Sequence, residues 1–350
     1  MILDRRTSRL CVVMPTWVGD IVMATPALRL LRSHLPEATI TAAVRPGLAP
    51  LLDGLDDLDE CVDIRPGGSL GPIRAGRRIA RTRPEAIVLL PNSMRSALVA
   101  RFSGARIRAG FRRQGRRLLL SHAITPPEHG QVHTTLEDYV ALAAALVDQP
   151  VPGPEACRPR LVVTEADRRA VSVDLDAGDF VVLVPGANRV DKRWPAEHFA
   201  RLADILAHDH GVRVFITGAP AEQALVREIA EATSCPVTDL AAAGMGLGGL
   251  KAVLAAASLV ISNDTGPRHI AAAVGTPIVS LFGPTDHRWT VLPGVVEHRL
   301  LAEPFLPESM LADRCTRVCH IDRITVGDVH AAAAALLAAS DGQPAAAPCD

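Results

Sequence analysis

Short apolar runs alternate along this chain with longer segments that have the composition of helices. Clear examples of the apolar runs end at Met14, Leu90, Val184 and Ser262, and each precedes a turn and a helix-like stretch. Strands that alternate with helices pair in parallel, because each crossover helix returns the chain to the same end of the sheet. The alternation therefore predicts an α/β protein built on parallel sheets.

The expected elements fall into two groups, separated by a segment rich in Pro and Gly. We expect strands at residues 10–14, 39–44, 86–90, 180–184, 212–217, 259–262 and 278–282, and helices at 24–34, 135–147, 196–208, 221–232 and 327–339. The segment 148–154 is typical of a linker. We predict two Rossmann-like domains, 1–155 and 156–350, that face a central cleft, and a C-terminal helix able to pack back on the first domain.

The composition is that of a globular protein, with 48% hydrophobic and 21% charged residues. We expect no transmembrane segment, because no uninterrupted apolar stretch is long enough, and no signal peptide, because residues 1–6 lack an apolar core. Seven cysteines without a Cys-x-x-Cys pair favour a reducing cytoplasm. Cys315, Cys319 and His320 resemble half of a metal site, but no second half-site accompanies them.

The charge is distributed unevenly between the two halves of the chain. Residues 1–150 contain 20 arginines and 14 acidic residues, a net charge of +6, whereas the rest carries −7. Eight arginines and no acidic residue lie between Arg95 and Arg117. This cluster is either a solvated face or a contact with a polyanion or an anionic membrane. Nucleic acid is disfavoured as the partner, because the cluster lacks aromatic side chains on which bases could stack.

The segment 262–269 joins an expected buried strand to an expected helix. Its sequence, Ser-Asn-Asp-Thr-Gly-Pro-Arg-His, leaves backbone N–H groups at the start of the helix, where the helix dipole adds partial positive charge. A phosphate is the natural ligand of such a turn. The alternative is an ordinary helix start, with Asp264 or Thr265 as the N-cap residue.

Three more strand ends carry polar residues. Asp20 follows the first strand on a glycine-containing turn, where it is either a helix N-cap or a catalytic base. Lys192 follows the strand 180–184 and is one of only two lysines in an arginine-rich chain. The use of lysine here indicates a compact positive charge that could contact a phosphate. Glu222 follows the strand 212–217, where it either complements a helix dipole or accepts a hydrogen bond from a ribose.

Five motifs occur in one order along the chain. They are Trp-Val-Gly-Asp at 17–20, Pro-Asn-Ser at 91–93, Pro-Gly-Ala at 185–187 with Lys-Arg-Trp-Pro at 192–195, Asn-Asp-Thr-Gly at 263–266 with His269, and Phe-Gly-Pro-Thr at 282–285. In this order the motifs resemble those of glycosyltransferase family 9, the ADP-heptose:lipopolysaccharide heptosyltransferases. The resemblance spans residues 9 to 340.

The resemblance implies a GT-B fold and an inverting transfer of a heptose from ADP-heptose to an anionic glycolipid acceptor at the membrane surface. It implies that Asp20 is the general base. The donor would be bound by Gly186, Lys192, Glu222, Asp264, Thr265, Gly266 and His269. The acceptor would be bound by Thr16, Trp17, Gly19, Asn92, Ser93, Arg112 and Arg113.

We expect no metal or other cofactor, because Lys192 and the helix start at 264–266 can together stabilise a departing diphosphate. We expect a cytoplasmic protein that could attach peripherally to the inner face of the membrane. Two other functions remain open from the residues alone: a nucleotide-sugar epimerase and a non-catalytic nucleotide-sugar-binding protein. Neither would need a carboxylate at Asp20 that faces an acceptor.

Overall fold

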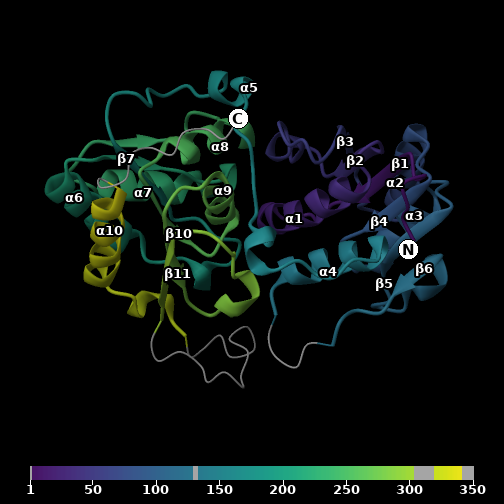
Figure 1. Cartoon of the computed structure of the whole chain (residues 1–350). Coiled ribbons are helices and arrows are strands. Elements are labelled where there is room, and N and C mark those ends of the chain that lie inside the picture. The colour runs from purple at the N-terminus through teal and green to yellow at the C-terminus, as the bar shows by residue number, and fades with distance from the viewer. Residues whose placement is uncertain (1, 129–132, 303–318, 341–350) are drawn as a thin grey trace. The chain divides into compact units, whose positions relative to one another are not determined.

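The computed structural model describes residues 2–128, 133–302 and 319–340, and the chain divides into two compact units (Figure 1). The first unit comprises Met1–Val162 and Arg288–Gly294, and the second comprises Val163–His287 and Val295–Asp350. Each unit contains one six-stranded parallel sheet with helices on both faces.

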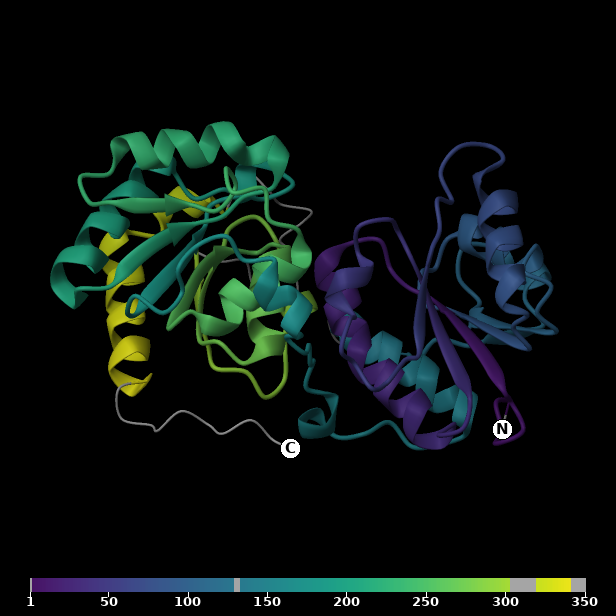
Figure 2. The same ribbon diagram turned by 90° about the horizontal axis from the view of Figure 1, so that it is seen from above.

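The sheet of the first unit has the strand order β3-β2-β1-β4-β5-β6. Helices α1 and α4 pack against each other on one face, and α2 and α3 cover the other face (Figure 2). The elements are β1 (Arg9–Val13), α1 (Val18–His34), β2 (Thr39–Val44), β3 (Glu60–Asp63), α2 (Gly71–Ile79), β4 (Ala86–Leu89), α3 (Met94–Arg101), β5 (Ile107–Phe111), β6 (His122–Ile124) and α4 (Thr135–Val147).

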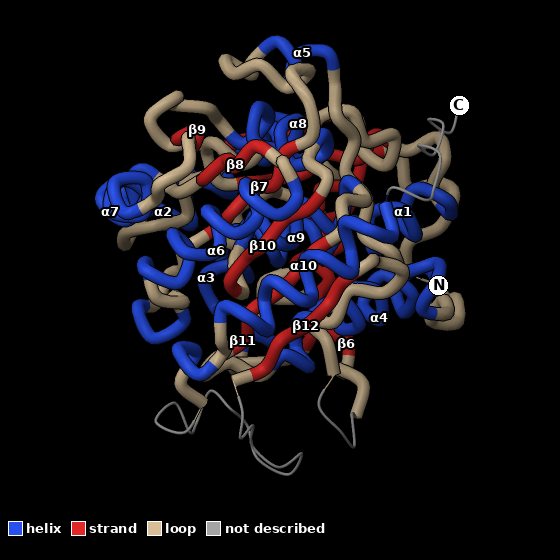
Figure 3. Tube along the Cα trace, turned by 90° about the vertical axis from the view of Figure 1, so that its left-hand side faces the viewer, coloured by secondary structure: helices blue, strands red, loops and turns tan. Residues whose placement is uncertain are grey.

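The sheet of the second unit has the order β12-β11-β10-β7-β8-β9, which repeats the topology of the first. In Figure 3, α6 and α10 lie over its strands. The elements are α5 (Glu165–Arg169), β7 (Phe180–Val184), α6 (Ala196–His210), β8 (Arg213–Ile216), α7 (Gln223–Ala232), β9 (Val237–Asp239), α8 (Leu247–Ala256), β10 (Leu259–Asn263), α9 (Gly266–Val274), β11 (Ile278–Phe282), β12 (Glu297–Leu301) and α10 (Val326–Ser340).

The central strands are buried on both faces, which explains their continuous apolar sequences. Every residue of β7, β10 and β11 is buried. The expected strands all form, with ends that shift by one residue at most. The helix expected near the C-terminus, α10, packs within the second unit, against α6 and the strands β10 to β12.

The helix expected to begin at residue 24 begins six residues earlier, at Val18. The β-branched residues Val18, Ile21 and Val22 and the glycine at 19 have weak helix propensity. Burial of Ile21 and Val22 against the sheet outweighs that preference. As a result, Asp20 lies in the first turn of α1 rather than on a turn before it.

Each sheet has a topological switch point, where neighbouring strands lead to helices on opposite faces. In the first unit it lies between β1 and β4, and in the second between β7 and β10. Ligands of such sheets bind at the carboxyl ends of the strands beside this point. The sequence motifs at 17–20, 91–93, 185–195 and 263–266 follow these four strands.

Candidate active site

Asp20 lies at the switch point of the first unit, three residues into α1. The N-cap residue of this helix is Trp17, which makes no capping hydrogen bond through its side chain. The N-cap alternative for Asp20 is therefore wrong. Burial raises the pKa of the Asp20 carboxyl to about 6. A carboxylate with this pKa is still ionised at neutral pH and is a stronger base than an exposed aspartate.

A small cavity of about 330 Å³ surrounds Asp20. Polar side chains from several elements line it: Thr16, Asn92, Arg113, Thr135, Asp138 and Tyr139. Asp138 forms an ion pair with Arg113, whose Nη2 lies 3.4 Å from the carboxylate, and His133 Nε2 also lies 3.4 Å from it. The cavity therefore combines a carboxyl of raised pKa, Asp20, with a carboxylate that is paired with an arginine, Asp138. Asp138 and Tyr139 were not expected here from the sequence, although they interrupt the otherwise apolar face of α4.

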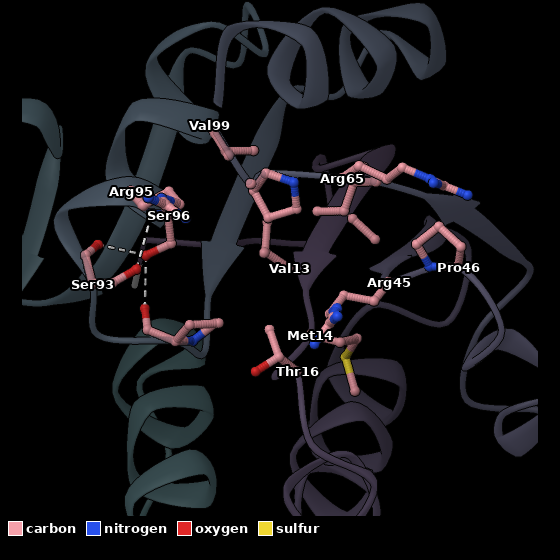
Figure 4. A pocket seen from close by; sticks show the side chains of 15 residues that line it. Val13, Met14, Thr16, Arg45, Pro46, Arg65, Ser93, Arg95, Ser96 and Val99 are labelled. Atoms are coloured by element: carbon pink, nitrogen blue, oxygen red, sulfur yellow. Dashed lines mark hydrogen bonds between the residues drawn. The ribbon is translucent and has the colours of Figure 1, made fainter. Parts of the chain in front are cut away.

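A larger cavity of about 620 Å³ lies beside this one and shares Thr16 and Pro91 with it. Figure 4 shows three arginines around it: Arg45 after β2, Arg65 after β3 and Arg95 in α3. None of the described residues that line this cavity is acidic. Its chemistry suits an anionic ligand. Arg45 and Arg65 were not expected here from the sequence, because they lie outside the motifs and the arginine cluster.

The expected acceptor-binding residues have different environments in the first unit. Thr16 and Asn92 line the cavity of Asp20, and Ser93 lines the larger cavity. The Ser93 hydroxyl also caps α3 by accepting a hydrogen bond from Ser96 N at 3.1 Å. Trp17 is 61% exposed, whereas Gly19 is buried.

The arginine cluster between Arg95 and Arg117 is not one surface. Arg116 is fully buried and donates to the carbonyl oxygens of Phe111 and Pro91 and to Asn92 Oδ1. Its role is structural, because it holds the loops after β4 and β5 together. Arg113 lines the cavity of Asp20, whereas Arg112 is exposed and lines none of the cavities described here.

The switch point of the second unit brings Lys192 and Asp264 together. Lys192 follows β7 and Asp264 follows β10, and Lys192 Nζ lies 3.0 Å from Asp264 Oδ2. Burial alone would raise the pKa of Asp264, but Lys192 and Arg268 hold it below its usual value. Asp264 does not cap α9, whose N-cap residue is Thr265 and has no side-chain capping bond. The start of this helix, at Gly266, retains its positive dipole beside Lys192.

A second layer of buried charge supports this pair. Arg268 is fully buried, with Nη1 3.5 Å from Asp264 Oδ1 and Nε 2.6 Å from Glu297 Oε1. Arg299 Nε lies 2.7 Å from the other oxygen of Glu297. Burial would raise the pKa of Glu297, but Arg268 and Arg299 lower it to about 2. Three cations and two carboxylates leave this cluster net positive, which favours an anionic ligand. The pairing of Arg268 with Glu297 was not expected from the sequence, because the two residues meet only when β11 pairs with β12.

Gly186 and Glu222 are also in contact. A Cβ atom at position 186 would lie 2.1 Å from Glu222 Oε2, so a side chain at this position would displace the carboxylate from where it lies. Glu222 Oε2 accepts a hydrogen bond from Ala219 N at 2.9 Å. His269 is buried in α9, and burial together with the Arg268 charge lowers its pKa to about 3. It is therefore neutral at physiological pH.

Within residues 2–128, 133–302 and 319–340, no group of three or more His, Cys, Asp or Glu side chains could hold a metal ion. Cys319 is buried, and Cys315 lies outside the described residues. In the same part of the chain, no helix is both long enough and apolar enough to cross a bilayer.

The sequence model of glycosyltransferase family 9 (heptosyltransferase) matches residues 73–300. The chain belongs to this family. Lipopolysaccharide heptosyltransferase 2 of Salmonella typhimurium is 29% identical over 299 residues, which cover 81% of this chain and 84% of the relative. The Escherichia coli K12 protein of the same name is 29% identical over 300 residues, with the same coverage.

Solved structures agree with this assignment. The structure of ADP-heptose lipopolysaccharide heptosyltransferase II from E. coli superposes with a TM-score of 0.80 at 26% identity, over 95% of this chain and all of the other. A family 9 glycosyltransferase from Veillonella parvula has the same fold, with a TM-score of 0.82 at 21% identity over 97% of this chain and 99% of that one. The family, the enzyme class and the GT-B fold expected from the sequence are confirmed. In this family 9 enzyme, polar residues follow the core strands of both units.

Proposed function

We propose that this family 9 enzyme transfers a heptose from ADP-heptose to a hydroxyl group of a lipopolysaccharide inner-core acceptor. The names of its relatives suggest both substrates. The acceptor oxygen forms a bond to the anomeric carbon of the heptose as the bond from that carbon to the diphosphate breaks. Attack from the face opposite the diphosphate inverts the configuration at this carbon.

The environment of Asp20 is the observation that carries the proposal. Its carboxyl has a raised pKa and lines a polar cavity in the first unit, whereas the cationic cluster belongs to the second unit. In the proposed reaction, Asp20 takes the proton of the acceptor hydroxyl. A base whose pKa lies close to the working pH is suited to this step.

We assign stabilisation of the departing ADP to Lys192 and the start of α9. The Lys192 ammonium, held 3.0 Å from Asp264, would contact the diphosphate, and the N–H groups at Thr265 and Gly266 would donate to its oxygens. Gly186 and His269 would contact the donor in the same region, and Glu222 would accept a hydrogen bond from its ribose. Because these groups supply positive charge, the reaction would need no metal ion.

The cavity that contains Arg45, Arg65 and Arg95 supports an acidic acceptor. It shares Thr16 with the cavity of Asp20, so a ligand that spans both would present a hydroxyl to the base and its anionic groups to the arginines. Asn92, Ser93 and Arg113 would contact the same ligand, and Trp17, Gly19 and Arg112 complete the proposed acceptor set. We propose a cytoplasmic enzyme that meets this glycolipid at the inner face of the membrane.

Incubation of the purified protein with ADP-heptose, with and without a Kdo–lipid A acceptor, tests this function. We expect ADP release that depends on the acceptor, and an acceptor that gains one heptose by mass spectrometry. Isomerisation of the nucleotide sugar without acceptor would indicate an epimerase. Binding of ADP-heptose with neither reaction would indicate a non-catalytic protein.

A further inference from the structure

The outer face of the layer formed by α2, α3 and the 3₁₀ turn Arg116–Leu119 exposes large apolar side chains. Ten large hydrophobic residues are exposed among the described residues, and four of them lie here: Leu70, Met94, Phe102 and Leu118. Leu118 is 95% exposed. Single exposed leucines are common, but four such side chains on one helical layer are not expected without a partner.

The three segments form a continuous surface. Helix α2 packs against α3, and α3 packs against the turn that carries Leu118. At the first contact, Gly76 lies directly against Phe102, since a Cβ atom at position 76 would come within 2.6 Å of Phe102 Cβ. At the second, Met94 lies close to Gly115, at the entry of the turn.

The same face is basic. Arg77, Arg78, Arg81, Arg101 and Arg117 are exposed on α2, on α3 and on turns that come after these helices in the chain. On α2 the exposed residues recur at a spacing of three or four, which is one helical stripe, while Ala75 and Ile79 are buried and Gly76 lies against α3. Residues 71–83 and 94–117 contain no acidic residue at all. A partner of this face must therefore be both anionic and able to accept apolar side chains.

We propose that this α2–α3 face binds the surface of an anionic lipid bilayer, with Leu70, Met94, Phe102 and Leu118 inserted among the lipids and the arginines at the headgroups. A bilayer with acidic headgroups offers both properties in one plane. The inference deepens the proposed function, because a glycolipid acceptor is presented at such a surface. It also separates two groups of arginines: Arg45, Arg65 and Arg95 line the cavity, and Arg77, Arg81 and Arg101 bind the membrane.

Sedimentation of the full-length protein with vesicles tests the proposal without any acceptor or donor. Vesicles of phosphatidylcholine with phosphatidylglycerol should bind the wild type, and vesicles of phosphatidylcholine alone should bind it much more weakly. Binding should weaken as salt is added. Equal binding to both kinds of vesicle, or to neither, would overturn the proposal.

Two variants locate the binding face. Replacement of Arg77, Arg81 and Arg101 by Gln should lower the partition coefficient by about fivefold for each arginine. Leu118→Ser should lower it by at least about tenfold, because an inserted leucine is removed. The matched controls replace Arg169, Arg201 and Arg227 by Gln, and Val151 by Ser; all four are exposed and lie outside this face.

The controls should bind vesicles as the wild type does. If the test variants also bind unchanged, another surface meets the membrane and the proposal fails. If they instead change the oligomeric state in analytical ultracentrifugation, the face is a contact between copies of this chain. Because no transfer is measured, failure here and failure of the proposed function are distinguishable.

Discussion

Lys192 and Asp264 are 72 residues apart in the chain, yet their side chains meet at 3.0 Å beyond the ends of β7 and β10. The contact depends on the pairing of these two strands at the switch point of the second sheet. Arg268, which is itself paired with Glu297, lies against the other oxygen of Asp264. The ammonium group is therefore held in place without a ligand, so the proposed contact with a diphosphate would need little reorganisation.

Replacement of Lys192 by Ala should weaken binding of ADP-heptose and slow transfer by roughly 10²-fold or more, because positive charge near the departing diphosphate is lost. Lys192→Arg should restore part of the activity. EDTA should leave the wild type active. Initial rates with and without chelator provide the measurement, and activity that EDTA removes and Mg²⁺ restores would contradict metal independence.

Asp20→Asn should lower kcat by about 10²–10⁴-fold, because the amide cannot take the acceptor proton. The affinity for ADP-heptose, measured by calorimetry, should stay close to that of the wild type. In the wild type, kcat/KM should fall below about pH 6, where Asp20 becomes protonated. Asp148→Asn, at an exposed position in the same unit, is the control. A variant at position 20 with the rate of the wild type would show that another group is the base.

The same substitution should stabilise the protein at neutral pH. The pKa of Asp20 is higher in the folded state than in the unfolded chain, so ionisation favours unfolding and the native state loses stability as the pH rises from about 4 to about 6. Asp20→Asn removes this penalty, on the order of 2 kcal/mol at pH 7.5. Urea unfolding should show the difference at pH 7.5 and little difference below pH 4. An equal effect at both pH values would mean that ionisation is not its cause.

Substitutions of different arginines in the first unit should affect different properties, either binding of the acceptor or stability of the fold. Replacement of Arg112 and Arg113 by Gln should raise the KM for the acceptor and flatten its salt dependence, with little change in the KM for the donor. Arg116→Gln should instead lower the free energy of unfolding by roughly 3 kcal/mol, because several buried hydrogen bonds are lost. Steady-state kinetics and urea unfolding distinguish the two effects. An unchanged KM for the acceptor in the double variant would show that Arg112 and Arg113 do not bind the acceptor.

Sequence patterns were sufficient for the centre of each sheet and insufficient for its edges. The core strands, such as Phe180–Val184, are apolar throughout because both of their faces are buried. The edge strands β3, β9 and β12 are short or polar, because part of each is exposed, and their sequences have no apolar run. The strands expected from the sequence therefore left out all four edge strands, β3, β6, β9 and β12, and also the internal strand β5, whose apolar sequence is broken by Arg108.

The candidate site shows the same division. Polar residues directly after core strands identified Asp20, Lys192 and Asp264, because strand ends in a parallel sheet meet at one edge. Arg268 and Glu297 carry no such signal, since they become partners only when β12 pairs with β11. Arg116 shows the reverse case: its neighbours in the chain suggested a surface charge, and only the packing of the loops after β4 and β5 buried it. The sequence determined which residues stand at the strand ends, whereas the tertiary structure decided which charges are paired, buried or left for a ligand, because these properties depend on contacts between distant segments.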